Sequence, residues 1–232
     1  MNCISAFQYD DLVKKMELWR ADRKLSKREQ VKNFKINYTK EFLEYLEAEK
    51  EGNEYEMIDA ICDMCIVCIN AGAVFSDCSY EASFKIPCYQ KMYKPTDDDF
   101  QILYTDLLRP LYDYATSGGR TRRIDIYPLF LQLNVRGYNP YLCLCQTINE
   151  LNSRTGKWNK KEGKWIKEKG AYTEEEAIKI ARERILKNPK ELGNPTPSYN
   201  SKTKQWYWFF ESEDIYIKLW RKADYSKCKI KE

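Results

Sequence analysis

The amino-acid sequence predicts a mainly α protein with a small α+β extension at its C-terminal end. Apolar residues recur at helical spacing through most of residues 1–152, whereas residues 153–170 are rich in Gly and Lys, and residues 205–220 are aromatic and β-branched. The chain has 232 residues, 43% of them apolar and 32% charged, which is enough to bury a core. We expect either one domain with an appendage or two small domains, divided into a helical core over 1–152 and an extension over 153–232.

Three amphipathic helices are expected first, over about 7–23, 26–50 and 54–74. A capping box that starts at Ser26 opens the second helix, and Asn53 is placed to cap the third. The C-terminal half of the third helix is almost continuously apolar. We therefore expect that half to lie in the centre of the core.

Three further helices are expected over about 97–116, 124–134 and 140–152, the last with a proline in its first turn. Residues 76–96 have a mixed pattern and receive no assignment. Together, residues 76–136 form a possible insertion in the helical core.

The extension has a different texture. Residues 153–170 read as a loop or a β-hairpin, and a capping box predicts a helix over 173–186. Residues 194–201 are a linker or turn. Two aromatic, β-branched runs around an acidic turn predict a β-hairpin over 205–220.

Composition excludes several classes of chemistry. The chain has no histidine, which rules out a Ser–His–Asp triad, a Cys–His dyad, an HExxH zinc site and a haem held by histidine. The nine cysteines are most simply free thiols in a reducing cytosol. Neither a signal-peptide pattern nor a long apolar span is found, so we expect a cytoplasmic protein without a membrane partner. The net charge is +4, but residues 153–232 carry 20 Lys and Arg against 12 Asp and Glu.

Carboxylates gather on the second and third expected helices. Glu41 and Glu44 share a face of one helix, and Glu56, Asp59 and Asp63 share a face of the next. A short loop makes the two helices an antiparallel hairpin, so these acids would face one another across its interior. Such a cluster needs a neutralising cation, and oxygen ligands suit Mg²⁺ or Mn²⁺.

A solvated acidic face is the alternative reading of the same spacing. Against it, Asp59 and Asp63 lie within an apolar run, where a solvated face is not expected. Asn70 continues the same polar line two turns further on.

The pattern EFLEYLEA at 41–48 followed by EMIDAICDMCIVCIN at 56–70 resembles the MazG-like all-α nucleoside triphosphate pyrophosphohydrolases. These are related to dimeric dUTPases and to phosphoribosyl-ATP pyrophosphohydrolase, and their motif is ExxE on one helix and ExxD on the next. Glu41 and Glu44 match the ExxE motif. The ExxD motif can be matched in either of two registers, Glu56 with Asp59 or Asp59 with Asp63, the latter leaving Ala60 where the family has Glu.

A second resemblance is to the closing segment of phage-type MazG proteins. It covers residues 137–158 and 163–167, and residues 222–230 are similar to the endings of such proteins. In the family, an Asn-Ser-Arg/Lys element at a helix end contacts the nucleotide. The resemblance implies substrate-binding roles for Asn70, Asn152, Arg154, Lys157 and Lys164.

The resemblance implies an antiparallel helix-bundle core of the all-α pyrophosphohydrolase type and a phage or bacterial enzyme of nucleotide metabolism. Its substrates would be (d)NTPs, hydrolysed at the α–β phosphate bond to a nucleoside monophosphate and pyrophosphate. One to three Mg²⁺ ions would be held by the five acids, and Glu44, with Glu41, would orient or deprotonate the attacking water. Assembly from helix pairs implies a homodimer or homotetramer.

Other constellations favour simpler interpretations. Cys62, Cys65 and Cys68 lie among apolar residues of one helix and are expected to be buried thiols. Five of the six tryptophans lie in the basic extension and could stack on single-stranded nucleic acid. We favour a small aromatic core instead, so nucleic acid is not an expected partner. The alternatives to the enzyme are a nucleic-acid-binding or regulatory nucleotide-binding module and a helical interaction protein.

Overall fold

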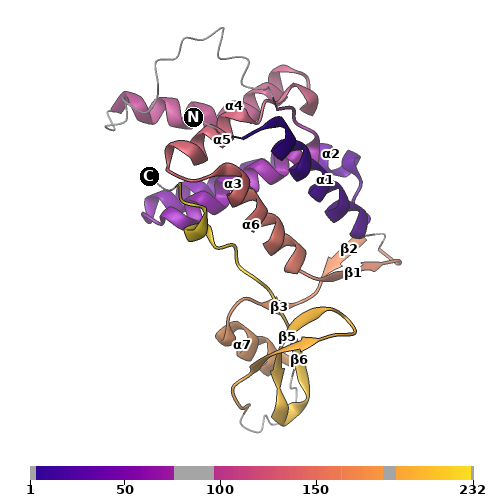
Figure 1. The fold of residues 1–232 in the computed structure, drawn as a ribbon. Coiled ribbons are helices and arrows are strands. Elements are labelled where there is room, and N and C mark those ends of the chain that lie inside the picture. The colour runs from indigo at the N-terminus through magenta and orange to yellow at the C-terminus, as the bar shows by residue number, and fades with distance from the viewer. Residues whose placement is uncertain (1–3, 76–96, 163, 185–191, 231–232) are drawn as a thin grey trace. The chain divides into compact units, whose positions relative to one another are not determined.

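The computed structural model describes residues 4–75, 97–162, 164–184 and 192–230 (Figure 1). The chain divides into two compact units, which are described separately. Unit 1 comprises Met1–Ile148 and Asp224–Glu232, and unit 2 comprises Asn149–Ala223. The sequence placed residues 224–230 in the extension and residues 149–152 in the helical core, whereas in the structure residues 224–230 belong to unit 1 and residues 149–152 to unit 2. None of the described helices combines the length and the apolar character needed to cross a membrane.

The mainly α fold class is confirmed, and the expected helices form close to their expected bounds. Local capping explains this agreement. The side chains of Ser5 and Ser26 each accept a hydrogen bond from a first-turn amide in a capping box, and Asn53 accepts one from the amide of Glu56. The helices are α1 (Ala6–Asp22), α2 (Lys27–Lys50), α3 (Glu54–Ala71), α4 (Asp97–Thr116), α5 (Tyr127–Val135) and α6 (Pro140–Ser153), with short 3-10 turns η3 (Thr121–Arg123) and η5 (Tyr225–Cys228).

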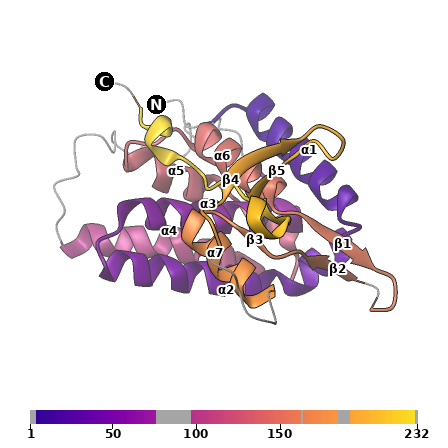
Figure 2. The same cartoon turned by 90° about the horizontal axis from the view of Figure 1, so that it is seen from below.

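Helices α2 and α3 form an antiparallel hairpin and lie side by side (Figures 1 and 2). The turn between them contains Gly52, whose φ of 68° is in the left-handed region that glycine adopts without strain. The buried seam of α2 follows an alternating spacing of four and three residues. Its apolar members are Phe34, Tyr38, Tyr45 and Ala48. The three cysteines of α3 are fully buried, in agreement with the prediction of buried thiols.

The remaining elements of unit 1 pack around this hairpin. The hydroxyl of Tyr9 on α1 donates to the carbonyl of Ala73 at 2.8 Å, and the hydroxyl of Tyr38 on α2 donates to the carbonyl of Leu107 on α4 at 2.6 Å. Leu107 and Phe130 are fully buried. Residues 97–136, expected to belong to a possible insertion, therefore contribute to the core of unit 1, while residues 76–96 lie outside the described residues.

The described residues of unit 2 form two small sheets and one complete α-helix. Its elements are β1 (Gly156–Asn159), β2 (Lys164–Lys167), β3 (Gly170–Ala171), α7 (Glu174–Arg184), β4 (Thr196–Asn200), β5 (Gln205–Phe210), η4 (Glu211–Glu213) and β6 (Ile215–Leu219). Strands β1 and β2 form an antiparallel hairpin, and the second sheet has the order β3-β6-β5-β4. The β-hairpin expected over 205–220 is formed by β5 and β6. Ala177 and Ala181 of α7 pack on Phe210 and Ile217 of this sheet, which gives unit 2 its own core.

Candidate functional site

Glu41 lies on the face of α2 that packs into the core, in line with the buried residues of this helix. It lies between Tyr38 and Tyr45 on the buried seam, and its side chain is only 13% exposed. One carboxylate oxygen, Oε2, is buried and has no hydrogen-bond partner. The other oxygen lies 3.5 Å from Nζ of Lys40. A buried carboxylate oxygen without a donor is costly, so this position calls for a cation or a proton.

The charge state of Glu41 reflects this burial. Burial and the neighbouring carboxylate of Glu44 raise the pKa of Glu41 to about 7, against the opposing effect of Lys40. Glu44 lies one turn further along and is half-exposed, with its carboxylate accepting a 2.7 Å hydrogen bond from Lys40. Two carboxylates with different environments therefore adjoin on α2.

Asp63 lies at the level of Glu41 on the other helix of the hairpin. The two residues are equally far from the Glu51–Asn53 connection, and both helices rise by about 1.5 Å per residue. Asp63 is partly buried. By the same reasoning Ala60, the position where the resemblance expects Glu, lies at the level of Glu44, and Ala60 is buried.

Asp59 is held by a residue from the end of the chain. The hydroxyl of Tyr225 in η5 donates to Oδ1 of Asp59 at 2.5 Å and lies 2.9 Å from the hydroxyl of Thr147 on α6. Burial raises the pKa of Tyr225 well above its ordinary value, so this hydroxyl keeps its proton at neutral pH. The sequence showed only that residues 222–230 resemble a family ending; it did not select Tyr225 or Thr147.

The five acids are therefore divided rather than gathered in one interior. Glu41 is largely buried, Glu44 is half-exposed, Asp63 is partly buried, Asp59 is bonded to Tyr225, and Glu56 lies in the first turn of α3. Within the described residues of this single chain, no three Cys, Asp or Glu side chains are arranged as a metal-binding group. Side chains of adjacent residues in a helix point about 100° apart. Asp59 therefore does not point in the direction of Ala60, the position where the resemblance expects Glu.

Asn70 at the end of α3 is buried and has a partner from α1. Its Oδ1 accepts a 2.8 Å hydrogen bond from Nη1 of Arg20, which is also buried. Next to this pair is a cavity of about 400 Å³ lined by Arg20, Lys27 and the acids Asp10 and Glu17, among others. The polar line expected along α3 thus ends in a buried charge-assisted hydrogen bond.

The predicted residues of unit 2 have different surroundings. Arg154 donates to Glu150 and, from Nε, to the hydroxyl of Tyr172 at 2.7 Å, so it belongs to a polar network. Lys157 on β1 is exposed, and Lys164 on β2 is paired with Glu162 at 2.6 Å. Asn152 lines a cavity of about 360 Å³ together with residues of the β5–β6 hairpin.

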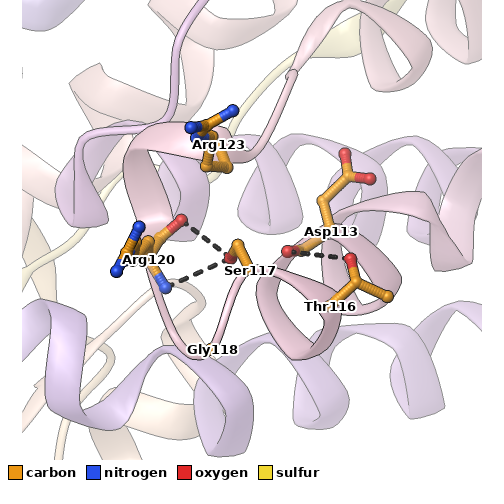
Figure 3. A pocket seen from close by; sticks show the side chains of 6 residues that line it. All are labelled: Asp113, Thr116, Ser117, Gly118, Arg120 and Arg123. Atoms are coloured by element: carbon orange, nitrogen blue, oxygen red, sulfur yellow. Dashed lines mark hydrogen bonds between the residues drawn. The ribbon is translucent and has the colours of Figure 1, made fainter.

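A cavity of about 600 Å³ adjoins the end of α4 (Figure 3). Arg120 and Arg123 line it together with Asp113, and the hydroxyl of Ser117 bonds to the backbone of Arg120. None of the residues selected from the sequence lines this cavity. Its lining carries charges of both signs, so its chemistry selects no class of ligand.

Comparison of the chain with protein-family models, with curated proteins and with solved structures found no match.

Proposed function

We propose that this protein is a Mg²⁺-dependent nucleoside triphosphate pyrophosphohydrolase. It would cleave (d)NTPs between the α and β phosphates and release a nucleoside monophosphate and pyrophosphate. The observation that carries the proposal is the buried, unpartnered Oε2 of Glu41, which lies on a helical hairpin with Glu44 and Asp63. The resemblance of the hairpin sequence to the MazG-like enzymes supports the same reaction.

The donor chemistry fits a hard divalent cation. Glu41 supplies a carboxylate oxygen that accepts no hydrogen bond, and Glu44 and Asp63 supply further carboxylates from the two helices of the hairpin. Asp59 and Glu56 are the remaining candidate ligands. Bound Mg²⁺, or Mn²⁺, would neutralise triphosphate charge and lower the pKa of a bound water.

Glu44, Glu41 and Tyr225 would then have separate roles in the reaction. Glu44, the more exposed carboxylate, accepts the proton of the water that adds to the α phosphorus, and the bond to the β-phosphate oxygen breaks to release pyrophosphate. A cation bound at Glu41 would favour the ionised form of this carboxylate, whose charge burial otherwise disfavours. Tyr225 fixes the rotamer of Asp59 through its hydrogen bond.

The test is pyrophosphate release from a panel of NTPs and dNTPs with Mg²⁺. Wild type should be active on at least one substrate, and Glu41→Gln and Asp63→Asn should each lower kcat by about 100-fold or more. Glu51→Gln removes an exposed carboxylate at the end of α2 and serves as the matched control. Inactivity of wild type across the panel, or full activity of a Glu41→Gln/Asp63→Asn double variant, would refute the function.

We also propose that the enzyme is a homodimer that pairs through the outer face of α2. Ile36 and Leu43 are two turns apart on this face and are 69% and 58% exposed, next to a shallow, mostly apolar hollow of about 470 Å³. A two-fold axis that sets Ile36 against the partner subunit's Leu43 also sets Lys32 against the partner subunit's Glu47. In this arrangement apolar side chains face apolar side chains and opposite charges face each other, so the face is self-complementary.

Sedimentation velocity checks the homodimer. Wild type should sediment as a dimer at micromolar concentration, and Leu43→Asp should sediment as a monomer. Leu18→Asp changes a leucine of similar exposure on α1, 67% against 58% for Leu43, and should leave the dimer intact. A monomeric wild type, or a dimer that survives Leu43→Asp, would exclude this interface.

A further inference from the structure

Helix α1 borders a cavity of about 400 Å³ at the C-terminal end of α3. One face of α1 lines one side of it, from Ala6 to Arg20. The segment from Ile69 to Phe75 lines the other side, and Lys27, the first residue of α2, adds to the lining. All of these residues belong to unit 1, so the cavity lies within one compact unit. Its volume falls in the range of small-molecule sites, about 300–1,000 Å³.

Arg20 is a buried cation that lines this cavity and is only 7% exposed. Within the described residues, its guanidinium donates one hydrogen bond, from Nη1 to Asn70 at 2.8 Å. Oε1 of Glu17 lies 3.9 Å from Nη2, a distance too long for a hydrogen bond. Nε and Nη2 form one edge of the planar guanidinium, and the donors of this edge match the two oxygens of a carboxylate. A buried guanidinium with two unbonded donors on one edge favours an acidic ligand.

Lys27 brings a second positive charge to the same end of α3. A Cβ at Gly72 would lie 2.6 Å from Nζ of Lys27, so the lysine side chain occupies the space that a side chain at position 72 would fill. Asn70, the partner of Arg20, is two residues before Gly72. Lys27 forms no ion pair with a carboxylate in the part of the chain that the structure describes. Two cations from different helices can therefore act on one anionic group.

Two acids on α1 give the lining negative charge as well. Glu17 is adjacent to Arg20 and its side chain is 58% exposed, so its carboxylate can turn toward a ligand. Asp10 lies two turns before Glu17 on α1, about 10 Å away by the rise of the helix. These acids would repel a ligand that carries only negative charge. The lining therefore favours a ligand that carries both charges.

The cavity also has an apolar part. Val13 lines it from α1, between the levels of the two acids, and Ile69 and Phe75 line the opposite side. The rings of Tyr9 and Phe75 are stacked, with centroids 5.2 Å apart and an angle of 27° between their planes. This stacking restricts the motion of Phe75 and forms an aromatic wall. An apolar group of a ligand would be buried against these side chains.

We propose that this cavity binds a free α-amino acid with an apolar side chain. Arg20 and Lys27 hold its carboxylate, and Glu17 holds its ammonium group. Its side chain packs against Val13, Ile69 and Phe75. The two charges of an α-amino acid are attached to the same carbon atom, so they require opposite charges only a few ångströms apart. The 3.9 Å between Nη2 of Arg20 and Oε1 of Glu17 provides this spacing.

This cavity is separate from the carboxylates proposed for hydrolysis. None of those five acids lines it, and Asn70 does not line it either. Amino-acid binding therefore does not depend on hydrolysis, and either property can fail without the other.

Titration calorimetry of the full chain in EDTA tests the site. The probes are L-leucine and L-phenylalanine, with the N-acetyl derivative and the amide of each, and dAMP. We expect at least one of the two amino acids to bind. Its N-acetyl derivative lacks the ammonium group and its amide lacks the carboxylate, so each should bind at least tenfold more weakly. Absence of amino-acid binding, or an N-acetyl derivative that binds as tightly as the amino acid, would overturn the proposal.

Variants at exposed positions decide whether binding occurs at this cavity. Glu17→Gln and Lys27→Gln should each weaken amino-acid binding at least fivefold, and Arg20→Lys should weaken it further because it loses the paired donors. The two exposed variants keep the test valid if Arg20→Lys unfolds the protein. Lys14→Gln/Asp22→Asn makes the same changes of charge on α1 outside the cavity and should bind as wild type does.

Two further results would also contradict the assignment. Asp10→Asn should weaken binding less than Glu17→Gln does, because Asp10 is about 10 Å from the carboxylate of Glu17. A larger effect of Asp10→Asn would exclude a ligand whose two charges share one carbon atom. Binding of dAMP that Lys27→Gln weakens would assign the cavity to a nucleotide instead, and wild-type affinity in both Glu17→Gln and Lys27→Gln would place the amino acid elsewhere.

Discussion

Tyr225 and Asp59 are 166 residues apart in the sequence and are joined by a 2.5 Å hydrogen bond from the tyrosine hydroxyl to the carboxylate. The bond attaches the last described turn of the chain to α3, within the same unit. Because Thr147 of α6 lies 2.9 Å from the same hydroxyl, three segments meet at one buried polar group. A buried network of this kind is costly to leave half-satisfied.

We expect Tyr225→Phe to lower the free energy of unfolding by about 1–3 kcal/mol, because Asp59 and Thr147 both lose a buried partner. Urea denaturation provides the measurement. Tyr112→Phe removes the hydroxyl of a 63%-exposed tyrosine in the same unit and should change stability by less than about 0.5 kcal/mol. Equal effects of the two variants would show that the network contributes nothing measurable.

The raised pKa of Glu41 predicts a pH dependence of stability in EDTA. In the folded chain burial and Glu44 raise this pKa to about 7, whereas an unfolded glutamate has a pKa of 4.5. The folded state binds this proton more tightly, so the contribution of Glu41 to stability is greatest at low pH and falls as pH rises from about 4.5 through 7. Between these values wild type should lose about 2 kcal/mol relative to Glu41→Gln.

Thermal melts of both proteins across this pH range provide the check, with Glu51→Gln as a variant that keeps the buried carboxylate. Mg²⁺ should restore stability to wild type at pH 8 and leave Glu41→Gln unchanged, since a bound cation stabilises the ionised form. If wild type and Glu41→Gln had parallel pH profiles in EDTA, Glu41 would not be the buried acid that the structure shows.

The buried pair of Arg20 and Asn70 should behave as a coupled unit. Asn70→Leu removes the acceptor of a buried guanidinium and should cost about 2–4 kcal/mol. Arg20→Met/Asn70→Leu replaces both polar groups and should be more stable than the sum of the two single effects by about 1–2 kcal/mol. A double-mutant cycle in urea measures this coupling. Additive effects would mean that the 2.8 Å hydrogen bond does not explain why Asn70 is buried.

Two glycines of unit 2 differ in how much space surrounds them. A Cβ at Gly170 would lie 2.4 Å from the indole of Trp220, which is 8% exposed and has little freedom to move. Gly170→Ala should therefore destabilise unit 2 by about 1–3 kcal/mol. No heavy atom lies within 4 Å of a Cβ at Gly193, so Gly193→Ala is the matched control.

Hydrogen exchange on the full chain reports the two glycine variants, because it reads the amides of β5 and β6 separately from those of α2 and α3. Gly170→Ala should accelerate exchange in the β5–β6 hairpin and leave the α2–α3 hairpin unaffected. Unchanged exchange in both variants would indicate that the indole of Trp220 can move aside without cost.

Most of the local structure could be predicted from the amino-acid sequence alone, although the linker or turn expected over 194–201 contains strand β4, Thr196–Asn200, whose pairing with β5 is a tertiary contact. Capping residues such as Ser26 and Asn53 and the apolar periodicity between them determine the helices, because both act within a few residues along the chain. The aromatic runs of β5 and β6 determine their hairpin for the same reason. The short connection at Gly52 also places the acids of α2 and α3 on one hairpin.

The environment of each functional group depends on the tertiary fold. Glu41 looks like any helical glutamate in the sequence, and its burial depends on what packs against the α2 seam. Asp59 accepts a hydrogen bond from Tyr225, which is distant in the chain. Packing also brings Lys218 of β6 and Arg221, which follows β6, to the same cavity as Thr155. Side-chain burial and long-range hydrogen bonds depend on the whole fold, whereas periodicity and capping report only on neighbouring residues.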